Sequence, residues 1–225
     1  MVGNKIINIK KWLENKLYET GAKGFVLGLS GGIDSAVTAI ICNLVSKKTL
    51  CLIMPCDSNP KDEEDAWLLT KKFNLSAIKV NLTNTYDEIK KDLNEQRVFD
   101  GVLPTDLANI KPRLRMIALY YYANKNNYLV VGCSNKTEIQ IGYSTKYGDG
   151  ACDILPIGSL LKKEVYEVAN ELNIPKEIIE KEPSAGLWEG QTDEGEIGYT
   201  YEQIDKFMEM KQKAEHKQQM PEVCK

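Results

Sequence analysis

Short apolar runs alternate with amphipathic segments from residue 1 to residue 132. The apolar runs are bounded by turn residues, which predicts buried or apolar strands at residues 25–29, 49–55 and 128–132 and a short strand at residues 76–80. Apolar residues that recur every three or four positions predict an opening helix that ends near Gly21 and further helices at residues 33–47, 61–73, 84–95 and 105–124. Pro112 is unfavourable inside the last of these helices and predicts a break there or a start near residue 111.

This order of elements predicts an α/β fold, a doubly wound and mostly parallel sheet with helices on both faces that binds ligands at the carboxyl ends of its strands. The rest of the chain is more polar. Two stretches with little periodicity, residues 134–158 and 180–198, are expected to be long functional loops. A helix that begins at Ser159, a favourable N-cap, and a last helix at residues 201–213 complete the set. We expect residues 1–225 to form a single domain.

Composition and charge narrow the function classes. The net charge of −3 argues against nucleic-acid binding, and the lysine pairs at 47–48, 71–72, 90–91 and 162–163 are expected on solvated helix faces. The chain has no run of about 18 apolar residues and its amino terminus lacks a signal segment, so we expect a cytoplasmic protein without membrane contact. The six cysteines form no CxxC pair and there is one histidine, so reduced thiols are expected and no zinc site is indicated.

The segment GFVLGLSGGIDSAVTAII runs from an apolar strand through a glycine turn into a helix. Gly31 and Gly32 have no Cβ, so the backbone can adopt positive φ angles there and its N–H groups can approach an anion. The amino terminus of the following helix favours the same anion, while Ser30 and Ser35 add hydroxyl donors. Asp34 adds a carboxylate for a cation such as Mg²⁺. The segment predicts a polyphosphate site, although a Gly-Gly turn alone would indicate only a tight strand-to-helix connection.

This glycine turn matches neither the GxxxxGK[ST] loop nor the G-x-G-x-x-G fingerprint. SGGIDS at residues 30–35 instead resembles the SGGxDS signature of the ATP pyrophosphatase superfamily, whose members split ATP into AMP and pyrophosphate. Further motifs follow, and they are NIKPRLRM (109–116), TKYGDGACDILPI (145–157), LLKKEV (160–165), KEPSAGLW (181–188) and QTDE (191–194). In this order they resemble the ammonia-dependent NAD synthetase family, and they span nearly the whole chain.

The resemblance implies a ligase that forms a carbon–nitrogen bond on an adenine nucleotide alpha hydrolase-like fold. ATP would adenylate the nicotinate carboxylate of deamido-NAD, pyrophosphate would leave, and ammonia would attack the acyl adenylate to give NAD. The resemblance also implies Mg²⁺ as cofactor, ATP as co-substrate and a cytoplasmic homodimer. Family members that use glutamine carry an additional glutaminase domain, for which we expect no room in this chain.

By the same resemblance, individual positions of this sequence take the site roles of the family. The ATP-binding positions are Gly28, Leu29, Ser30, Gly31, Gly32, Ile33, Asp34, Ser35, Cys133, Lys162 and Ser184. The deamido-NAD-binding positions are Arg113, Lys146, Asp153, His216 and Lys217. Asp34 and Glu138 would hold Mg²⁺, and Asp34 and Lys162 would be catalytic. Asp193 is a further candidate in the same neighbourhood.

Several alternatives stay open at this stage. Arg113 and Arg115 flank one apolar residue, so either can face the substrate, and we favour Arg113. Where the family usually has Thr, this chain has Cys133, whose thiol is a weak donor. We favour a backbone contact to ATP there, because Cys133 follows the strand end at Gly132. Competing functions are another ATP pyrophosphatase enzyme, such as a GMP synthetase-like amidating domain or a tRNA-modifying ligase, and a non-catalytic nucleotide-binding module.

Overall fold

The computed structural model describes residues 2–95, 104–188 and 190–219. Within these residues, parallel strands form a sheet in the order β3-β2-β1-β4. The strands are β1 (Gly24–Gly28), β2 (Thr49–Ile53), β3 (Ser76–Lys79) and β4 (Tyr128–Val130). The structure therefore confirms the predicted strands and their parallel arrangement, with ends that differ by one or two residues.

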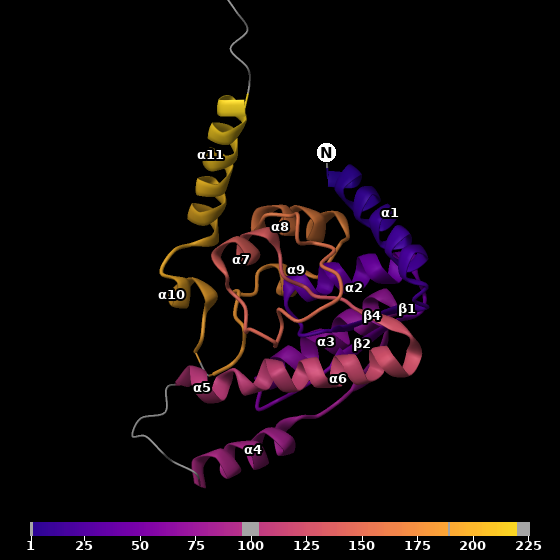
Figure 1. Ribbon diagram of the computed structural model, residues 1–225, viewed down its shortest axis with the longest axis vertical. Helices are drawn as coiled ribbons and strands as arrows, with labels where there is room; N and C mark the ends of the chain where they lie inside the picture. Colours follow the sequence, from indigo (N-terminus) through magenta and orange to yellow (C-terminus); the bar gives the residue numbers. More distant parts are fainter. Residues whose placement is uncertain (1, 96–103, 189, 220–225) are drawn as a thin grey trace, which may run out of the picture.

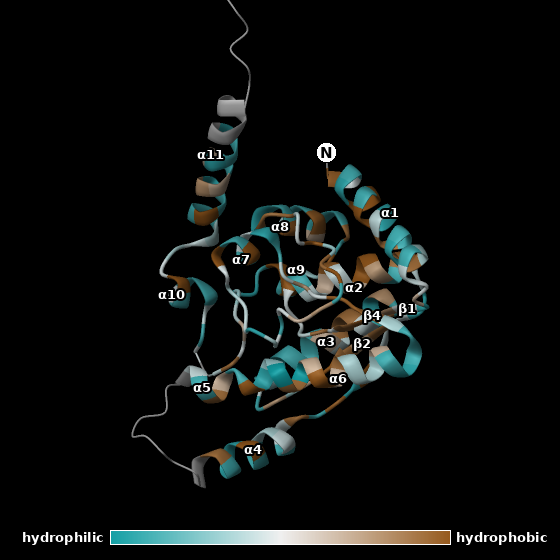
Figure 2. Ribbon diagram, viewed as in Figure 1, coloured by the Kyte–Doolittle hydropathy of each residue, from teal (hydrophilic) through white to brown (hydrophobic). Residues whose placement is uncertain are grey.

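Helices cover both faces of this sheet, as predicted (Figure 1). On one face, three helices contact one another, and they are α1 (Val2–Thr20), α2 (Ile33–Val45) and α8 (Lys162–Glu171). The other face is covered by α6 (Ile110–Asn126), with α4 (Thr83–Glu95) packed on its far side. Figure 2 shows the two layers as mixed brown and teal helices around a brown sheet. This arrangement is a doubly wound α/β fold.

The central strand β1 is buried on both faces. Phe25 and Leu27 belong to the main core beneath α1, α2 and α8, whereas Val26 belongs to a second core beneath α6. Each of the three side chains is 0% exposed. Successive side chains of a strand point to opposite faces, so a continuous apolar run is what a strand between two helix layers requires.

The order of the strands in the sheet indicates where the ligand-binding crevice lies. From β1 the chain passes through α2 to β2 on one side, and it later reaches β4 on the other side. The carboxyl ends of β1 and β4 therefore flank the point where strand order reverses, at which doubly wound sheets bind their ligands. The phosphate loop, residues 28–35, begins at the last residue of β1, and residues 131–138 follow β4. These two segments form the floor of the candidate site.

The predicted helix at 105–124 is two helices. A short α5 (Pro104–Ala108) ends before Asn109, and α6 begins at Ile110. Pro112 lies at the third position of α6, where the backbone N–H has no intrahelical partner in any case, so the ring is tolerated without a kink. The prediction of a helix start near residue 111 is therefore confirmed, with the break at Asn109.

The two expected loops contain more helix than the sequence pattern indicated. Residues 134–158 include α7 (Lys136–Ile141), and residues 180–198 include α10 (Asp193–Ile197). Ser159 is not the N-cap of α8, because that helix begins at Lys162 after Leu161. The remaining helices are α3 (Pro60–Phe73), α9 (Lys176–Ile179) and α11 (Tyr201–Gln219), which is longer than predicted.

Two further expectations can be compared with the described residues. Among them, none of the helices combines the length and the hydrophobicity that a membrane span needs. Free thiols are confirmed for the cysteines that the structure describes, which are Cys42, Cys51, Cys56, Cys133 and Cys152. Cys224 lies outside those residues.

Candidate active site

The phosphate loop is held by hydrogen bonds among its own residues. The hydroxyls of Ser30 and Ser35 lie 3.0 Å apart, and Ser35 Oγ donates to the carbonyl of Gly32 over 2.9 Å. The Gly32 N–H in turn donates to Ser30 Oγ over 3.3 Å. Gly32 is the N-cap of α2 and has no side chain to cap the first-turn amides, so these N–H groups are available to an anion. Of the other loop positions, Leu29 and Ile33 are buried and anchor the loop in the core.

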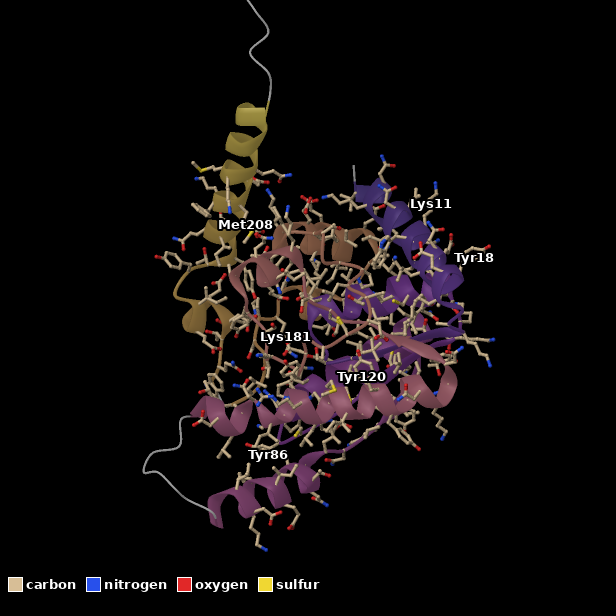
Figure 3. The ribbon with its side chains drawn as sticks, in the orientation of Figure 1. Lys11, Tyr18, Tyr86, Tyr120, Lys181 and Met208 are labelled. Carbon is tan, nitrogen blue, oxygen red and sulfur yellow. The ribbon has the colours of Figure 1, made fainter. Side chains whose placement is uncertain are left out.

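Gly31 is the tightest point of the loop. Its φ is +80°, and a Cβ at this position would lie 2.4 Å from the backbone oxygen of Asp62, at the start of α3. Only glycine avoids both the backbone strain and the clash. Lys181, which Figure 3 labels, then fixes α3, because its Nζ donates to Asp62 Oδ1 and Asp65 Oδ2, each over 2.7 Å. The segment that carries Ser184 is thereby attached to the helix that supports the loop.

A buried lysine lies between two carboxylates beside this loop. Lys162 Nζ donates to Asp34 Oδ2 over 2.6 Å and lies 3.4 Å from Glu138 Oε1. The three residues come from the first turns of α2, α7 and α8, so the fold brings together positions more than 100 residues apart in sequence. Lys162 is 2% exposed, so the expectation of a solvated 162–163 pair is wrong for Lys162, whereas Lys163 is exposed as expected.

The charges of this cluster do not balance. Two carboxylates face one ammonium, which leaves one negative charge in a largely buried place. Burial, together with the negative charge of Asp34, raises the pKa of Glu138 to about 8. Burial alone would lower the pKa of Lys162, but the carboxylates of Asp34 and Glu138 outweigh it and raise that pKa above its ordinary value. The cluster thus favours one more positive charge, either a proton or a cation.

Asn135 links Asp34 to Glu138 through hydrogen bonds. It is fully buried, its Nδ2 donates to Asp34 Oδ1 over 2.9 Å, and its Oδ1 accepts from the backbone N–H of Glu138 over 3.0 Å. The Asn135 N–H donates back to Glu138 Oε2 over 3.1 Å, which completes a capping box at the start of α7. Asn135 therefore fixes both the helix end and the position of Asp34.

A second set of groups surrounds Glu138. The Tyr201 hydroxyl donates to Asp193 Oδ2 over 2.9 Å and lies 3.4 Å from Glu138 Oε1, while its ring faces Lys162 Nζ at 4.7 Å. The Tyr143 hydroxyl donates to Asp193 Oδ1 over 3.0 Å. Asp193 and Tyr201 are each 5% exposed. The further candidate Asp193 thus belongs to the cluster, although it contacts Glu138 only through Tyr201.

The donor set suits Mg²⁺. Among the described residues, no group of three or more histidine, cysteine, aspartate or glutamate side chains is arranged to hold a metal. Mg²⁺ differs from zinc in that it commonly takes one or two protein carboxylates and completes its shell with water and phosphate oxygens. Asp34 and Glu138, with their uncompensated charge next to the phosphate loop, fit that pattern.

Two of the predicted ATP positions lie at the margins of the site. The Cys133 side chain packs against the main core, and burial raises the pKa of its thiol. Its side chain is therefore directed toward the core, which agrees with the preference for a backbone contact. Ser184 is exposed, and its Oγ accepts from the Gly186 N–H over 3.0 Å. The remaining position, Gly28, lies next to the side chain of Met54, the residue that follows β2.

The predicted dinucleotide positions fall into separate places. Arg113 is exposed, and its Nε donates to the Lys146 carbonyl over 3.2 Å, so these two lie together beside a cleft of about 420 Å³ that Lys146 and Tyr147 line. Asp153 lies on another cleft, of about 580 Å³, next to Trp12 and Lys16. Its carboxylate accepts from the Val130 N–H and from the hydroxyl of Tyr120, which Figure 3 labels on α6.

Arg115 and the carboxy-terminal positions complete the set. The Arg115 guanidinium is pinned to the loop after β2, where it donates to the Met54 carbonyl and to Ser58 Oγ. Arg113 is therefore the freer of the two arginines. His216 and Lys217 belong to α11, in a part whose side chains lie outside the described residues.

The sequence interpretation missed Asn135, Lys181 and Tyr201. The spacing of Asn135 and Glu138, an N-cap residue three positions before a glutamate, is a helix-start signal that could have revealed α7. Lys181 begins the KEPSAGLW motif, but nothing in that motif shows that it pairs with α3, and Tyr201 lies in no motif, since both roles depend on partners from distant segments.

Known proteins resemble this chain along its whole length. Residues 5–224 match the family model described as NAD synthase. The NH(3)-dependent NAD(+) synthetase of Carboxydothermus hydrogenoformans is 48% identical over 97% of this chain and 95% of its own. Among solved structures, the NMN synthetase of Francisella tularensis has a TM-score of 0.87 and 38% identity over 93% of this chain and 86% of its own. The NH3-dependent NAD synthetase of Campylobacter jejuni has a TM-score of 0.75 and 31% identity over the whole of both chains.

Proposed function

The chain belongs to the NAD synthase family, and from that premise we propose that it makes NAD from deamido-NAD, ammonia and ATP, with release of AMP and pyrophosphate. The observation that carries the proposal is the buried cluster of Asp34, Glu138 and Lys162 at the mouth of the phosphate loop. A protein that only bound a nucleotide would have no need of a buried ion-pair cluster with an uncompensated charge, whose cost in desolvation is high. Attack of a carboxylate on the α-phosphorus of ATP needs such charges.

Each part of the site has a role in the proposed reaction. The phosphate loop would hold the ATP phosphates with the amides at the start of α2. Lys162 would place positive charge on the phosphate oxygens as negative charge develops there, and Ser184 would contact the same phosphates. Mg²⁺, held by Asp34 and Glu138, would supply further positive charge to the leaving pyrophosphate. Formation of an acyl adenylate turns the nicotinate carboxylate into a good electrophile for ammonia without a protein nucleophile.

The nicotinate nucleotide would be bound outside this cluster. Arg113 and Lys146 are the stronger pair, supported by the hydrogen bond from the Arg113 guanidinium to the Lys146 carbonyl, and Asp153 would contribute from the second cleft. His216 and Lys217 remain proposals from the family resemblance. A two-fold symmetric homodimer is a further proposal, for which the exposed Trp12 and Tyr121 on α1 and α6 offer apolar surface. The cytoplasmic location stays a prediction.

One specific observation favours a second substrate. The solved structure named NMN synthetase has the highest TM-score of the structures described above. The same amidation of nicotinate mononucleotide would give NMN, and the Asp34, Glu138 and Lys162 cluster would act in the same way on either acid. The two substrates differ only in the adenylate half, which would lie away from the reacting carboxylate.

The experiment is a product assay. The protein is incubated with ATP, Mg²⁺ and ammonium chloride, and with either deamido-NAD or nicotinate mononucleotide, and AMP, pyrophosphate and the amide are quantified. The proposal expects AMP, pyrophosphate and NAD in equal amounts, and a higher kcat/KM for deamido-NAD. ADP and orthophosphate as the primary products would overturn the mechanism. A higher kcat/KM for nicotinate mononucleotide would mean that this acid is the preferred substrate, while the proposed amidation mechanism would stand.

A further inference from the structure

Helix α8 presents Lys162 from its first position, but it does not cap its own amino terminus fully. The N-cap residue is Leu161, whose side chain cannot accept a hydrogen bond. Within the helix, Glu164 Oε2 accepts only the N–H of Leu161, over 2.8 Å. The amides of the first helical residues must find acceptors elsewhere, because buried N–H groups without a partner are costly.

Two residues from other helices supply these acceptors. The Lys162 N–H donates to Thr137 Oγ1 of α7 over 2.9 Å, and the Lys163 N–H donates to Asp205 Oδ2 of α11 over 2.9 Å. The Thr137 hydroxyl itself donates to Asp205 Oδ1, so the two acceptors form one unit. Thr137 is 0% exposed and Asp205 is 2% exposed. An aspartate buried to this extent is unusual in the first turns of an otherwise polar helix.

The same helix reaches the other end of Lys162. Tyr201 lies four residues before Asp205, on the same face of α11, and its ring faces the Lys162 ammonium at 4.7 Å. The first turns of α11 therefore contact the charged end of Lys162 directly, through Tyr201, and its backbone amide indirectly, because Asp205 accepts from the Thr137 hydroxyl that in turn accepts the Lys162 N–H. Figure 1 shows α11 standing beside α7 and α8, and apart from the sheet that carries the phosphate loop.

We propose that Asp205 is a positioning residue: from α11 it caps α8 together with Thr137 and so fixes Lys162 between Asp34 and Glu138. The inference rests on the proposed function for its kinetic test only. Lys162 would act on charge that develops at the phosphate oxygens, so a misplaced Lys162 lowers kcat more than it raises the KM for ATP. Docking of α11 thus becomes a condition for an active ATP site.

Matched variants separate this role from general stability. Thr137→Val keeps the shape of the side chain and removes the hydroxyl, whereas Thr137→Ser keeps the hydroxyl. Asp205→Asn leaves one acceptor for two donors. Glu209→Gln is the control, because it removes an exposed carboxylate one turn later on α11 that pairs with the side chain of Lys163. We expect kcat to fall about five- to tenfold in Thr137→Val and Asp205→Asn, and less than about twofold in Thr137→Ser and Glu209→Gln.

A readout without substrate keeps this inference distinct from the proposed function. In protein labelled with ¹³C-lysine and free of nucleotide, the ¹³Cε resonance of Lys162, assigned by its loss in Lys162→Met, reports the contact with Asp34. It should shift in Thr137→Val and Asp205→Asn and stay in place in Thr137→Ser and Glu209→Gln. If the parent protein makes no NAD but the resonance shifts in this pattern, the positioning role stands and the proposed function fails.

Two results would overturn the positioning role. The first is an unchanged Lys162 resonance in both Thr137→Val and Asp205→Asn, with melting temperatures that show both variants folded. The second is a loss of kcat from Asp205→Asn that is as large in a Lys162→Met background as in the parent, since a residue that acts through Lys162 loses its effect when Lys162 is absent.

Discussion

The phosphate loop and the Asp34, Glu138 and Lys162 cluster lie side by side but are built in opposite ways. Apart from Asp34, which belongs to both regions, the turn of the loop is shaped by hydrogen bonds among Ser30, Gly32 and Ser35. The cluster joins side chains up to 128 positions apart. The loop depends on backbone geometry that a few residue types permit, whereas the cluster depends on the whole fold to hold its charges. We therefore expect the two regions to fail differently when mutated: the loop by strain, the cluster by charge.

The largest effect should come from the charges. Asp34→Asn and Glu138→Gln should each lower kcat at least about a hundredfold, because each removes a carboxylate that we propose as a Mg²⁺ ligand during phosphoryl transfer. Gln at position 138 can still accept the Asn135 N–H of the capping box, so α7 should persist. Steady-state rates at limiting Mg²⁺, with circular dichroism to verify the fold, provide the measurement.

Asp87→Asn is the control for this experiment. It removes a half-exposed carboxylate on α4 that, among the described residues, forms a salt bridge only with Lys90 on the same helix, so kcat should stay within about twofold of the parent. Near-normal turnover of Asp34→Asn or Glu138→Gln at limiting Mg²⁺ would show that the substituted residue is not a Mg²⁺ ligand. It would also contradict the expectation that the cluster fails through loss of charge.

The loop should fail through its backbone. Gly31→Ala places a residue with a side chain at a φ of +80°, which costs about 1–3 kcal/mol, and pushes a methyl group against the Asp62 carbonyl. We expect a lower melting temperature and a KM for ATP raised about tenfold or more. The adjacent change Gly32→Ala is the matched comparison, because φ there is −88° and the nearest atom to the new Cβ, Ser30 Oγ, is 3.4 Å away. Equal loss of thermal stability in both variants would contradict the strain argument.

The same contrast explains what the sequence predicts. The strand, glycine turn and helix at residues 24–45 follow from local residue types, and the structure has them within one or two positions. Helix α8 was predicted to start too early, because Ser159 is a better local cap than Leu161, but the real caps are Thr137 and Asp205. A cap that comes from another helix cannot be predicted from the residues next to the helix start. The residues that complete the cluster are hidden for the same reason.

The unbalanced charge of the cluster should appear in the pH dependence of stability. The pKa of Glu138 is raised from 4.5 to about 8, so the folded protein keeps a proton that the unfolded chain releases. This contribution to stability is fully present below pH 4.5 and is lost as the pH rises to about 8. Glu138→Gln does not titrate. Its free energy of unfolding relative to the parent should therefore rise between pH 4.5 and pH 8 and then level off.

Urea unfolding of both metal-free proteins at several pH values measures this difference. Gln also weakens the contact with Lys162, which shifts the difference in free energy of unfolding by a constant amount. The informative quantity is therefore how this difference changes with pH, not its absolute value. A difference that stays constant from pH 4.5 to pH 8.5 would show that Glu138 is ionised throughout this range, and that Lys162 alone suffices to compensate the cluster.

The smallest effect on activity should come from substitutions of Cys133, which follows β4 beside the phosphate loop and packs against the main core. The thiol packs into the main core, so a contact to ATP at this position should come from the backbone that follows β4. We expect Cys133→Thr to leave the KM for ATP within about twofold of the parent. Cys133→Val, which removes the thiol and adds bulk at the β-carbon, should weaken ATP binding only modestly. If the Thr hydroxyl instead reached the nucleotide, a hydrogen bond of about 0.5–1.5 kcal/mol would lower the KM about two- to tenfold. Measured KM values for both variants decide between the two, and a fivefold or greater decrease in Cys133→Thr would mean that the side chain at position 133 belongs to the loop's chemistry and not to the core.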